Sequence, residues 1–267
     1  LFVRFALKFL GVGSKSRSTA RLSLFGAAFG IGISIVPLVV TLIVTDGMVQ
    51  GISERTVELG TGQAQVVNVQ PSAYASNCKH EIAIKKVLKS EIANSFFCDA
   101  WVQREGQGLL VGKNGRSGGM IRSIEAEFFT ENEKGKSLIT VIAGEPALSR
   151  DSSIILGKKI AEKLSLNVGD VCRLITLKEN TEGKKTPKVS VFTVEAIISS
   201  GYQELDALWM FIPLSRGLEI LSSYSSIDSV LLATQNPFDN FRFNSFLNEV
   251  QIKLLSMDAL PKTFEVY

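Results

Sequence analysis

The sequence predicts an α+β protein in which one N-terminal transmembrane helix is followed by an extracytoplasmic domain. Residues 22–45 carry no charge, and at about 1.5 Å per residue a helix of this length crosses the roughly 30 Å of hydrocarbon in a bilayer. Two later segments each show a strand, a helix and a strand in succession, and a run of short strands separates them. We expect the two β-α-β segments to form one split, ferredoxin-like layer, with an inserted strand-rich subdomain.

Charged residues beside the apolar segment predict its direction across the membrane. Five cations and no acidic residue precede it, whereas acidic residues follow it at positions 46, 54 and 58. By the positive-inside rule, the N-terminus is cytoplasmic and the domain after residue 46 lies on the other side. The apolar run exceeds the roughly 7–15 residues of a signal-peptide core and ends without a clear cleavage site, so we interpret it as an uncleaved anchor.

This interpretation divides the chain into five parts. Residues 1–21 are expected to form a cytoplasmic interfacial helix and an elbow, because Arg4 and Lys8 lie on a different helix face from the apolar residues. The other parts are the transmembrane helix at 22–45, a stalk at 46–63, the split β-α-β subdomain at 64–106 and 225–267, and the inserted β-rich subdomain at 107–224.

Apolar periodicity places the elements of the exported domain. In the split layer we expect strands at 64–70, 98–102, 226–234 and 263–267. A helix at 80–94 carries Ile82, Ile84, Val87, Leu88 and Ile92, and a helix at 237–255 presents one face made by Phe241, Phe246, Val250 and Leu254. In the insert we expect strands at 108–112, 119–126, 137–145, 170–178, 188–198 and 207–214, a helix at 152–166, and a hairpin turn in the glycine-rich segment 112–119.

Small residues form one face of the anchor. Gly26, Gly30 and Ser34 follow a small-xxx-small pattern, and Pro37 removes one backbone hydrogen bond. Met48 follows where the helix leaves the membrane. A simple tether needs none of these features, so we expect this face to pack against partner helices or to line a substrate cleft; a lipid-exposed face is the alternative.

Known catalytic patterns are missing from the sequence. It has no phosphate-binding G-x-x-x-x-G-K-[ST] motif and no H-E-x-x-H. The three cysteines are widely spaced, and the single His80 does not complete a metal set with them. We therefore expect a protein without catalytic residues, cofactor or metal, with isolated and mostly buried thiols; one disulfide among Cys78, Cys98 and Cys172 is the alternative. The net charge of +3 gives no reason to expect a nucleic-acid partner.

Several strings resemble the first membrane helix and extracytoplasmic domain of the lipoprotein-releasing ABC-transporter permeases, within the wider family that includes the macrolide-exporter type. They are FALKFL, the glycine-rich anchor followed by Asp46-Gly47-Met48, ILGKKIAEKLSLNVGD at 155–170, FTVEAIISSGYQELDALWMFIPL at 192–214, and TFEVY. The string at 155–170 indicates a strand, then a helix with Ile160, Ala161 and Leu164 inward, and then a turn. The string at 192–214 places Gly201, Glu204 and Asp206 at a bend between two strands.

The resemblance implies a permease subunit in the bacterial inner membrane that extracts lipoproteins and passes them to a periplasmic carrier. Its implied partners are an ABC ATPase subunit, a second permease subunit, the lipoprotein substrate, the carrier and membrane lipid. Members of this family have three further membrane helices, so we expect this sequence to be a fragment or the product of a split or alternatively started gene. Efflux or cell-division permeases and a membrane-anchored scaffold are the alternatives.

The resemblance also implies a carrier-docking loop at residues 178–188. Its candidate residues are Lys178, Lys184, Lys185, Pro187 and Lys188. A cationic loop attracts an acidic carrier, and this attraction weakens as salt rises. The alternative is an ordinary solvated hairpin loop.

Overall fold

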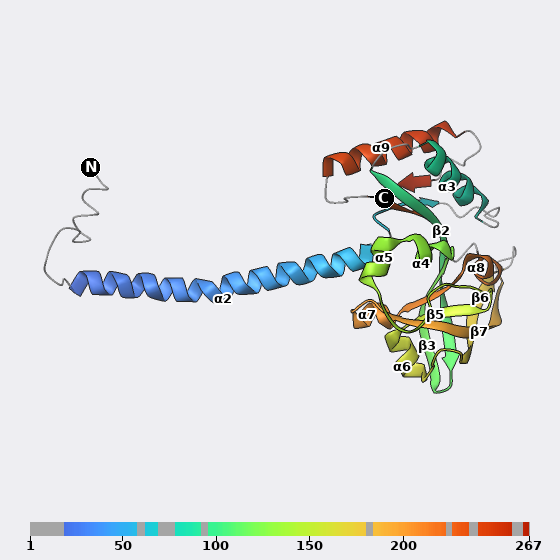
Figure 1. Cartoon of the computed structure of the whole chain (residues 1–267), viewed down its shortest axis with the longest axis horizontal. Coiled ribbons are helices and arrows are strands. Elements are labelled where there is room, and N and C mark those ends of the chain that lie inside the picture. The colour runs from blue at the N-terminus through green and yellow to red at the C-terminus, as the bar shows by residue number, and fades with distance from the viewer. Residues whose placement is uncertain are drawn as a thin grey trace. The chain divides into compact units, whose positions relative to one another are not determined.

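The computed structural model describes residues 19–57, 62–68, 78–91, 96–179, 184–222, 226–234, 240–257 and 264–266 (Figure 1). The chain separates into two compact units, residues 1–53 and residues 54–267. The expected interfacial helix and most of the elbow lie outside the described residues.

Most of one long helix, α2 (Thr19–Thr56), lies in the first unit, which confirms the expected N-terminal apolar helix. The helix extends past residue 45 into the segment expected to form a stalk. Its part from Phe25 to Ser53 is long and apolar enough to cross a membrane. Pro37 lies inside the helix without ending it. The hydroxyl of Ser34 donates to the Gly30 carbonyl and that of Thr41 to the Pro37 carbonyl, both at 2.8 Å. These hydroxyl groups are satisfied within the helix, as a hydrocarbon environment requires.

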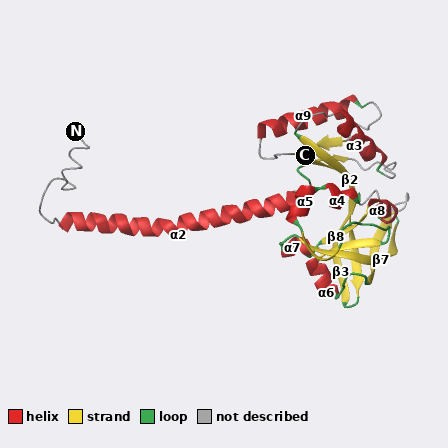
Figure 2. Ribbon diagram, viewed as in Figure 1, coloured by secondary structure: helices red, strands yellow, loops and turns green. Residues whose placement is uncertain are grey.

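The second unit begins with a ferredoxin-like layer. Its strands follow the order β10 (Phe264–Val266), β1 (Ala64–Asn68), β9 (Ile227–Thr234) and β2 (Phe97–Gly112), and all neighbours are antiparallel. Helices α3 (Lys79–Glu91) and α9 (Asn240–Ser256) bury Ile84, Leu88, Phe246 and Val250 in one cluster with alternate residues of these strands. Figure 2 shows both helices on the same side of the strands. The two β-α-β segments therefore interleave, as expected.

Strand β2 continues beyond this layer into a ring of six strands. The ring runs β2, β3 (Gly115–Ile124), β8 (Trp209–Pro213), β5 (Ser153–Gly157), β7 (Lys185–Ser199) and β6 (Val171–Glu179), and β6 returns to β2. Strand β4 (Thr140–Gly144) extends the sheet beyond β7. A core cluster includes Leu110, Ile154, Leu174, Phe192 and Met210 from five of the ring strands. The short helices are α4 (Glu127–Glu131), α5 (Glu133–Leu138), α6 (Lys158–Leu164), α7 (Gln203–Asp206) and α8 (Leu214–Ile220).

The helix predicted at 152–166 is wrong in its first third. Residues 153–157 form the buried strand β5 between β7 and β8, and only residues 158–164 are helical. The periodicity of apolar residues alone does not distinguish a short apolar run in a central strand from one turn of a buried helix. The finer pattern from the resemblance, a strand followed by a helix with Ile160, Ala161 and Leu164 inward, is confirmed.

Two predicted apolar positions are exposed. Phe241 is 86 % exposed and Ile82 is 48 % exposed, whereas Phe246, Val250 and Leu254 are buried. The buried stripe of α9 therefore does not include the side of the helix that carries Phe241. The predicted turn at 112–119 is confirmed but is tighter than expected, because Gly112 already pairs with Gly115.

Candidate docking site on the β6–β7 hairpin

The predicted anchor residues share one face of α2. At about 100° per residue, Gly26, Gly30, Ser34, Pro37 and Met48 fall within an arc of about 80°. No atom outside the local helix lies within 4 Å of a Cβ placed on Gly26 or Gly30. A second helix could therefore approach this face closely, and its role in packing remains a prediction.

The predicted docking loop is shorter than residues 178–188. Strand β6 reaches Glu179 and β7 begins at Lys185, with Lys178 opposite Thr186 and Leu177 opposite Pro187. The expectation of a long loop is wrong because the polar residues at both of its ends continue the backbone pairing between β6 and β7. Residues 180–183 lie outside the described part of the chain.

The predicted lysines divide into two groups. The ammonium groups of Lys178 and Lys188 donate to the Glu219 carbonyl of α8 at 3.4 and 3.3 Å, and Lys188 also pairs with the Glu219 carboxylate at 3.0 Å. The Lys188 hydrogen bond, together with Arg216, lowers the pKa of Glu219. By contrast, Lys184 is exposed, and Lys185 lies 3.8 Å from Glu179. Lys184 and Lys185 are therefore the lysines best placed to meet a partner.

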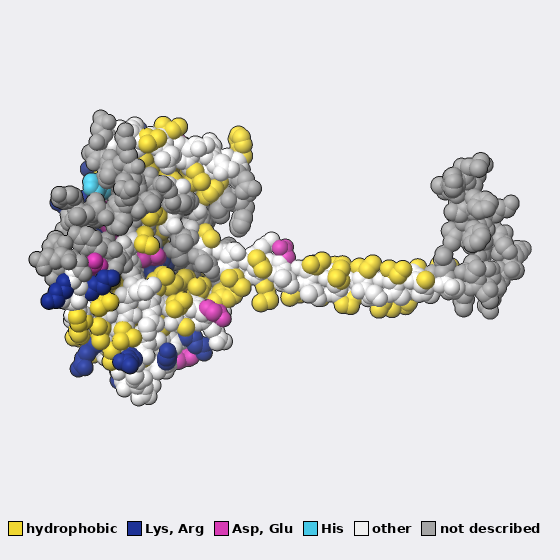
Figure 3. Space-filling model, turned by 180° about the vertical axis from the view of Figure 1, so that it is seen from behind, with side chains coloured by type: hydrophobic (Ala, Val, Ile, Leu, Met, Phe, Trp, Pro, Cys, Tyr) yellow, Lys and Arg dark blue, Asp and Glu magenta, His cyan; other side chains and the backbone are white. Residues whose placement is uncertain are grey.

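The outer face of the hairpin is apolar, which the sequence analysis missed. Val171, Leu177, Val189 and Val191 are each more than half exposed. The pairing places Ile175 opposite Val189 and Arg173 opposite Val191 on this face. We call these six residues, together with Pro187, the outer hairpin face. Figure 3 shows hydrophobic side chains, with Lys and Arg around them, on the side of the domain that carries β6 and β7. The sequence carried one signal for this apolar face. Apolar residues occur at both odd-numbered and even-numbered positions along 171–177 and 189–194.

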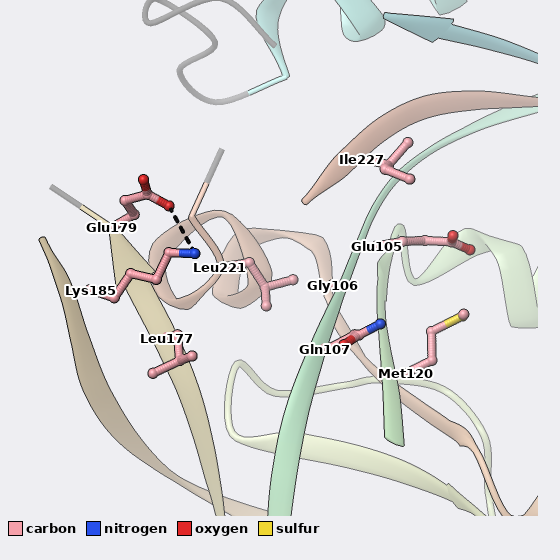
Figure 4. Close-up of a pocket in the computed structure, with 9 residues that line it drawn as sticks. All are labelled: Glu105, Gly106, Gln107, Met120, Leu177, Glu179, Lys185, Leu221 and Ile227. Atoms are coloured by element: carbon pink, nitrogen blue, oxygen red, sulfur yellow. Dashed lines mark ion pairs between the residues drawn. The ribbon is translucent and has the colours of Figure 1, made fainter. Parts of the chain in front are cut away.

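A cavity of about 250 Å³ opens between the hairpin and β2. The two strands pair only from Leu109 to Val111, and the hairpin then diverges from β2. Leu177 lines one side of the cavity, Met120 and Ile227 line the other, and Gly106 and Leu221 lie between them (Figure 4). A Cβ on Gly106 would lie 2.8 Å from Leu221 Cδ2, so glycine allows this close approach.

Charged groups surround this apolar cavity. Glu105, Glu179 and Lys185 line it, and Glu105 also pairs with Arg122 at 3.1 Å. Arg122 is fully buried, and its guanidinium lies 5.3 Å from the Phe211 ring centroid. Burial lowers the pKa of Arg122, while Glu105 opposes that shift. The arrangement suits an apolar side chain or acyl segment that enters between charged groups.

A helix long and apolar enough to cross a membrane precedes this mixed α+β domain, an arrangement that fits a membrane-anchored protein. The model of one family, the MacB-like periplasmic core domain, matches residues 24–244, and the chain belongs to this family. The chain is thus a permease component of an ABC transporter, which implies an ATPase partner and a second permease subunit. The predicted α+β fold class with its N-terminal helix is confirmed.

Two solved structures are similar to the chain. The periplasmic region of MacB from Actinobacillus actinomycetemcomitans is 15 % identical with a TM-score of 0.47, and the match covers 76 % of this chain and 87 % of that one. The extracellular domain of the noncanonic ABC-type transporter YknZ from Gram-positive bacteria is 12 % identical with a TM-score of 0.47, over 76 % of this chain and 99 % of that one. No curated protein matches the chain.

Proposed function

We propose that this chain is a permease subunit that extracts lipoproteins from the bacterial inner membrane and passes them to a periplasmic carrier. The N-terminus is cytoplasmic, the domain is periplasmic, and the domain relays motion driven by the separate ATPase. The observation that carries the proposal is the exposed apolar outer hairpin face beside the cavity. Large apolar surfaces that face solvent mark sites of protein interaction.

In this proposal the carrier docks on the outer hairpin face. An apolar side chain of the carrier enters the cavity beside Leu177, while Lys184 and Lys185 attract acidic groups at its rim. The anchor face formed by Gly26, Gly30 and Ser34 packs against a partner helix or lines the cleft through which acyl chains leave the bilayer. Membrane lipid and the second permease subunit are then the neighbours of α2.

Efflux of a small amphiphile is the second candidate, because the family model is that of the MacB-like domain. The same outer hairpin face would then contact an efflux adaptor instead of a lipoprotein carrier. The two functions differ in the partner that binds and in the cargo that leaves the membrane.

Binding of the purified carrier to the full chain in lipid nanodiscs tests the proposal. The double variant Lys184→Glu/Lys185→Glu should lower the association rate about tenfold at low salt, because steering acts mainly on this rate. The matched control is Lys158→Glu/Lys159→Glu on α6, where both lysines are partly exposed and pair with Glu162. Unchanged binding by the hairpin variant would place the docking site elsewhere. Binding of an efflux adaptor but not of the carrier would favour the second candidate.

A further inference from the structure

A thiol and two carboxylates meet inside the ferredoxin-like layer, away from the hairpin. The Sγ of Cys78 and one carboxylate oxygen each from Glu81 and Asp228 all lie within 4.8 Å of one another. Their residues are 2 %, 4 % and 8 % exposed. Cys78 immediately precedes α3, Glu81 lies in its first turn, and Asp228 is the second residue of β9. Two elements that are distant in the sequence therefore supply these three groups.

Asp228 is held in place from one side by Arg104 of β2. The Nε and Nη2 atoms of Arg104 donate to the two oxygens of Asp228 at 2.5 and 2.6 Å, and Arg104 is 1 % exposed. This forked contact uses one lone pair on each carboxylate oxygen. The Cys78 thiol also hydrogen-bonds to the Asp228 carboxylate, so the thiol and this carboxylate are already in direct contact, and the carboxylate orientation is fixed.

Within the described part of the chain, no salt bridge to Glu81 is seen, although the nearby Arg104 charge acts to lower its pKa. Its side chain is buried, and within the described part of the chain its recorded hydrogen-bond donor is its own backbone amide. Burial, as the largest cause, and the Asp228 charge raise the pKa of Glu81 and of the Cys78 thiol, and the Arg104 charge opposes both shifts. A buried carboxylate that faces another carboxylate and a thiol is costly unless a positive charge joins them.

We propose that Cys78, Glu81 and Asp228 bind a divalent transition-metal ion of the zinc type, with Arg104 positioning Asp228. The charges then balance, because a thiolate and two carboxylates are compensated by the guanidinium and a doubly charged ion. A thiolate ligand selects zinc-like ions over magnesium or calcium, which prefer oxygen donors alone. Three protein ligands leave a fourth position for water.

Such an ion would connect the start of α3 to β9. The helix packs on the strands through Ile84 and Leu88, one and two turns further along the chain. The ion would therefore add a second attachment at the first turn of α3. Binding would also release the thiol proton, so the affinity should fall as pH decreases.

Cobalt and cadmium titration of the full chain in detergent micelles, with the thiols kept reduced, tests this site. The probe is the metal ion alone, and the readout is the thiolate-to-metal charge-transfer absorption. We expect one equivalent to give this band in the native chain and in the controls Cys98→Ser and Cys172→Ser. The band should disappear in Cys78→Ser, and Glu81→Gln should weaken binding at least about tenfold.

Folding is monitored separately, because a ligand variant that unfolds would also lose the band. The comparison uses the native chain, Cys172→Ser and Cys78→Ser, provided that all three show native circular dichroism without metal. Zinc should then raise the unfolding temperature of the native chain and of Cys172→Ser, but not that of Cys78→Ser. If Cys78→Ser does not fold, the Glu81→Gln affinity decides. The proposal is wrong if the native chain shows no charge-transfer band, if Glu81→Gln binds as tightly as the native chain, or if the band is lost in Cys98→Ser instead.

Discussion

Replacing Glu105 by glutamine should destabilise the domain, because Glu105 provides the carboxylate that pairs with the buried Arg122. The Nε of Arg122 lies 3.1 Å from the Glu105 carboxylate, and its Nη2 donates to Gln103 Oε1 at 2.5 Å. The guanidinium also lies over the rings of Phe211 and Trp209. Glutamine keeps the size of the side chain and removes its charge, so the variant isolates the electrostatic contribution.

The expected size of the effect follows from the burial of the two partners. Removal of one partner from a buried ion pair costs about 3–5 kcal/mol. The Glu105 side chain is 25 % exposed, and the glutamine carbonyl still accepts the Arg122 hydrogen bond, so the cost should be smaller. We expect a loss of about 2–3 kcal/mol, which corresponds to a fall in Tm of roughly 4–12 °C for a domain of this size.

Thermal unfolding of the full chain in detergent, followed by near-ultraviolet circular dichroism, measures this loss. Glu162→Gln is the matched control, because Glu162 pairs with Lys158 and Lys159 on an exposed helix surface. The control should unfold at the temperature of the native chain. Equal shifts in both variants, or a loss below about 1 kcal/mol for Glu105→Gln, would refute the assignment of Arg122 and Glu105 as a stabilising buried pair.

Two further predictions concern thiol reactivity and close packing. A thiol reagent at mildly alkaline pH should label Cys98 alone in the native chain and all three cysteines after denaturation. The reason is that Cys78 and Cys172 are buried, and burial raises the pKa of Cys172 to about 12. Mass spectrometry that finds Cys172 labelled as fast as Cys98 would contradict this prediction. Gly119→Ala should cost about 1–3 kcal/mol in urea unfolding, since its Cβ would lie 2.6 Å from the Leu208 carbonyl oxygen. The adjacent control Gly118→Ala meets no atom within 4 Å and should not be destabilised; equal stability of the two variants would disprove the close contact.

Much of the fold could be predicted from apolar periodicity. The strand at Ala64–Asn68, the helix through Ile84 and Leu88, and the helix through Phe246 and Val250 each have a buried face with the expected period. These patterns depend only on residues that are close in the sequence. They can therefore be recognised without knowing which elements pack against each other. The run at 153–157 is different, because a strand buried on both faces has no alternation to detect.

The candidate sites depend on contacts between distant parts of the chain. The cavity forms where β6 diverges from β2, and its lining residues extend from Glu105 to Ile227. Similarly, Asp228 meets Cys78 only because β9 lies between β1 and β2. Spacing in the sequence could not show either arrangement. The lysine-rich segment at 178–188 was recognisable, but the contacts of Lys178 and Lys188 with Glu219 of α8 were not.

The most direct test of the permease assignment is purification of the tagged full chain from native membranes in mild detergent. We expect an ABC ATPase and a second permease chain to copurify with it. Gly30→Leu should reduce their recovery because it blocks close approach to the anchor face, whereas Pro37→Ala should have a smaller effect. Recovery of the chain without an ATPase, at an expression level at which it is correctly inserted and folded, would contradict the account.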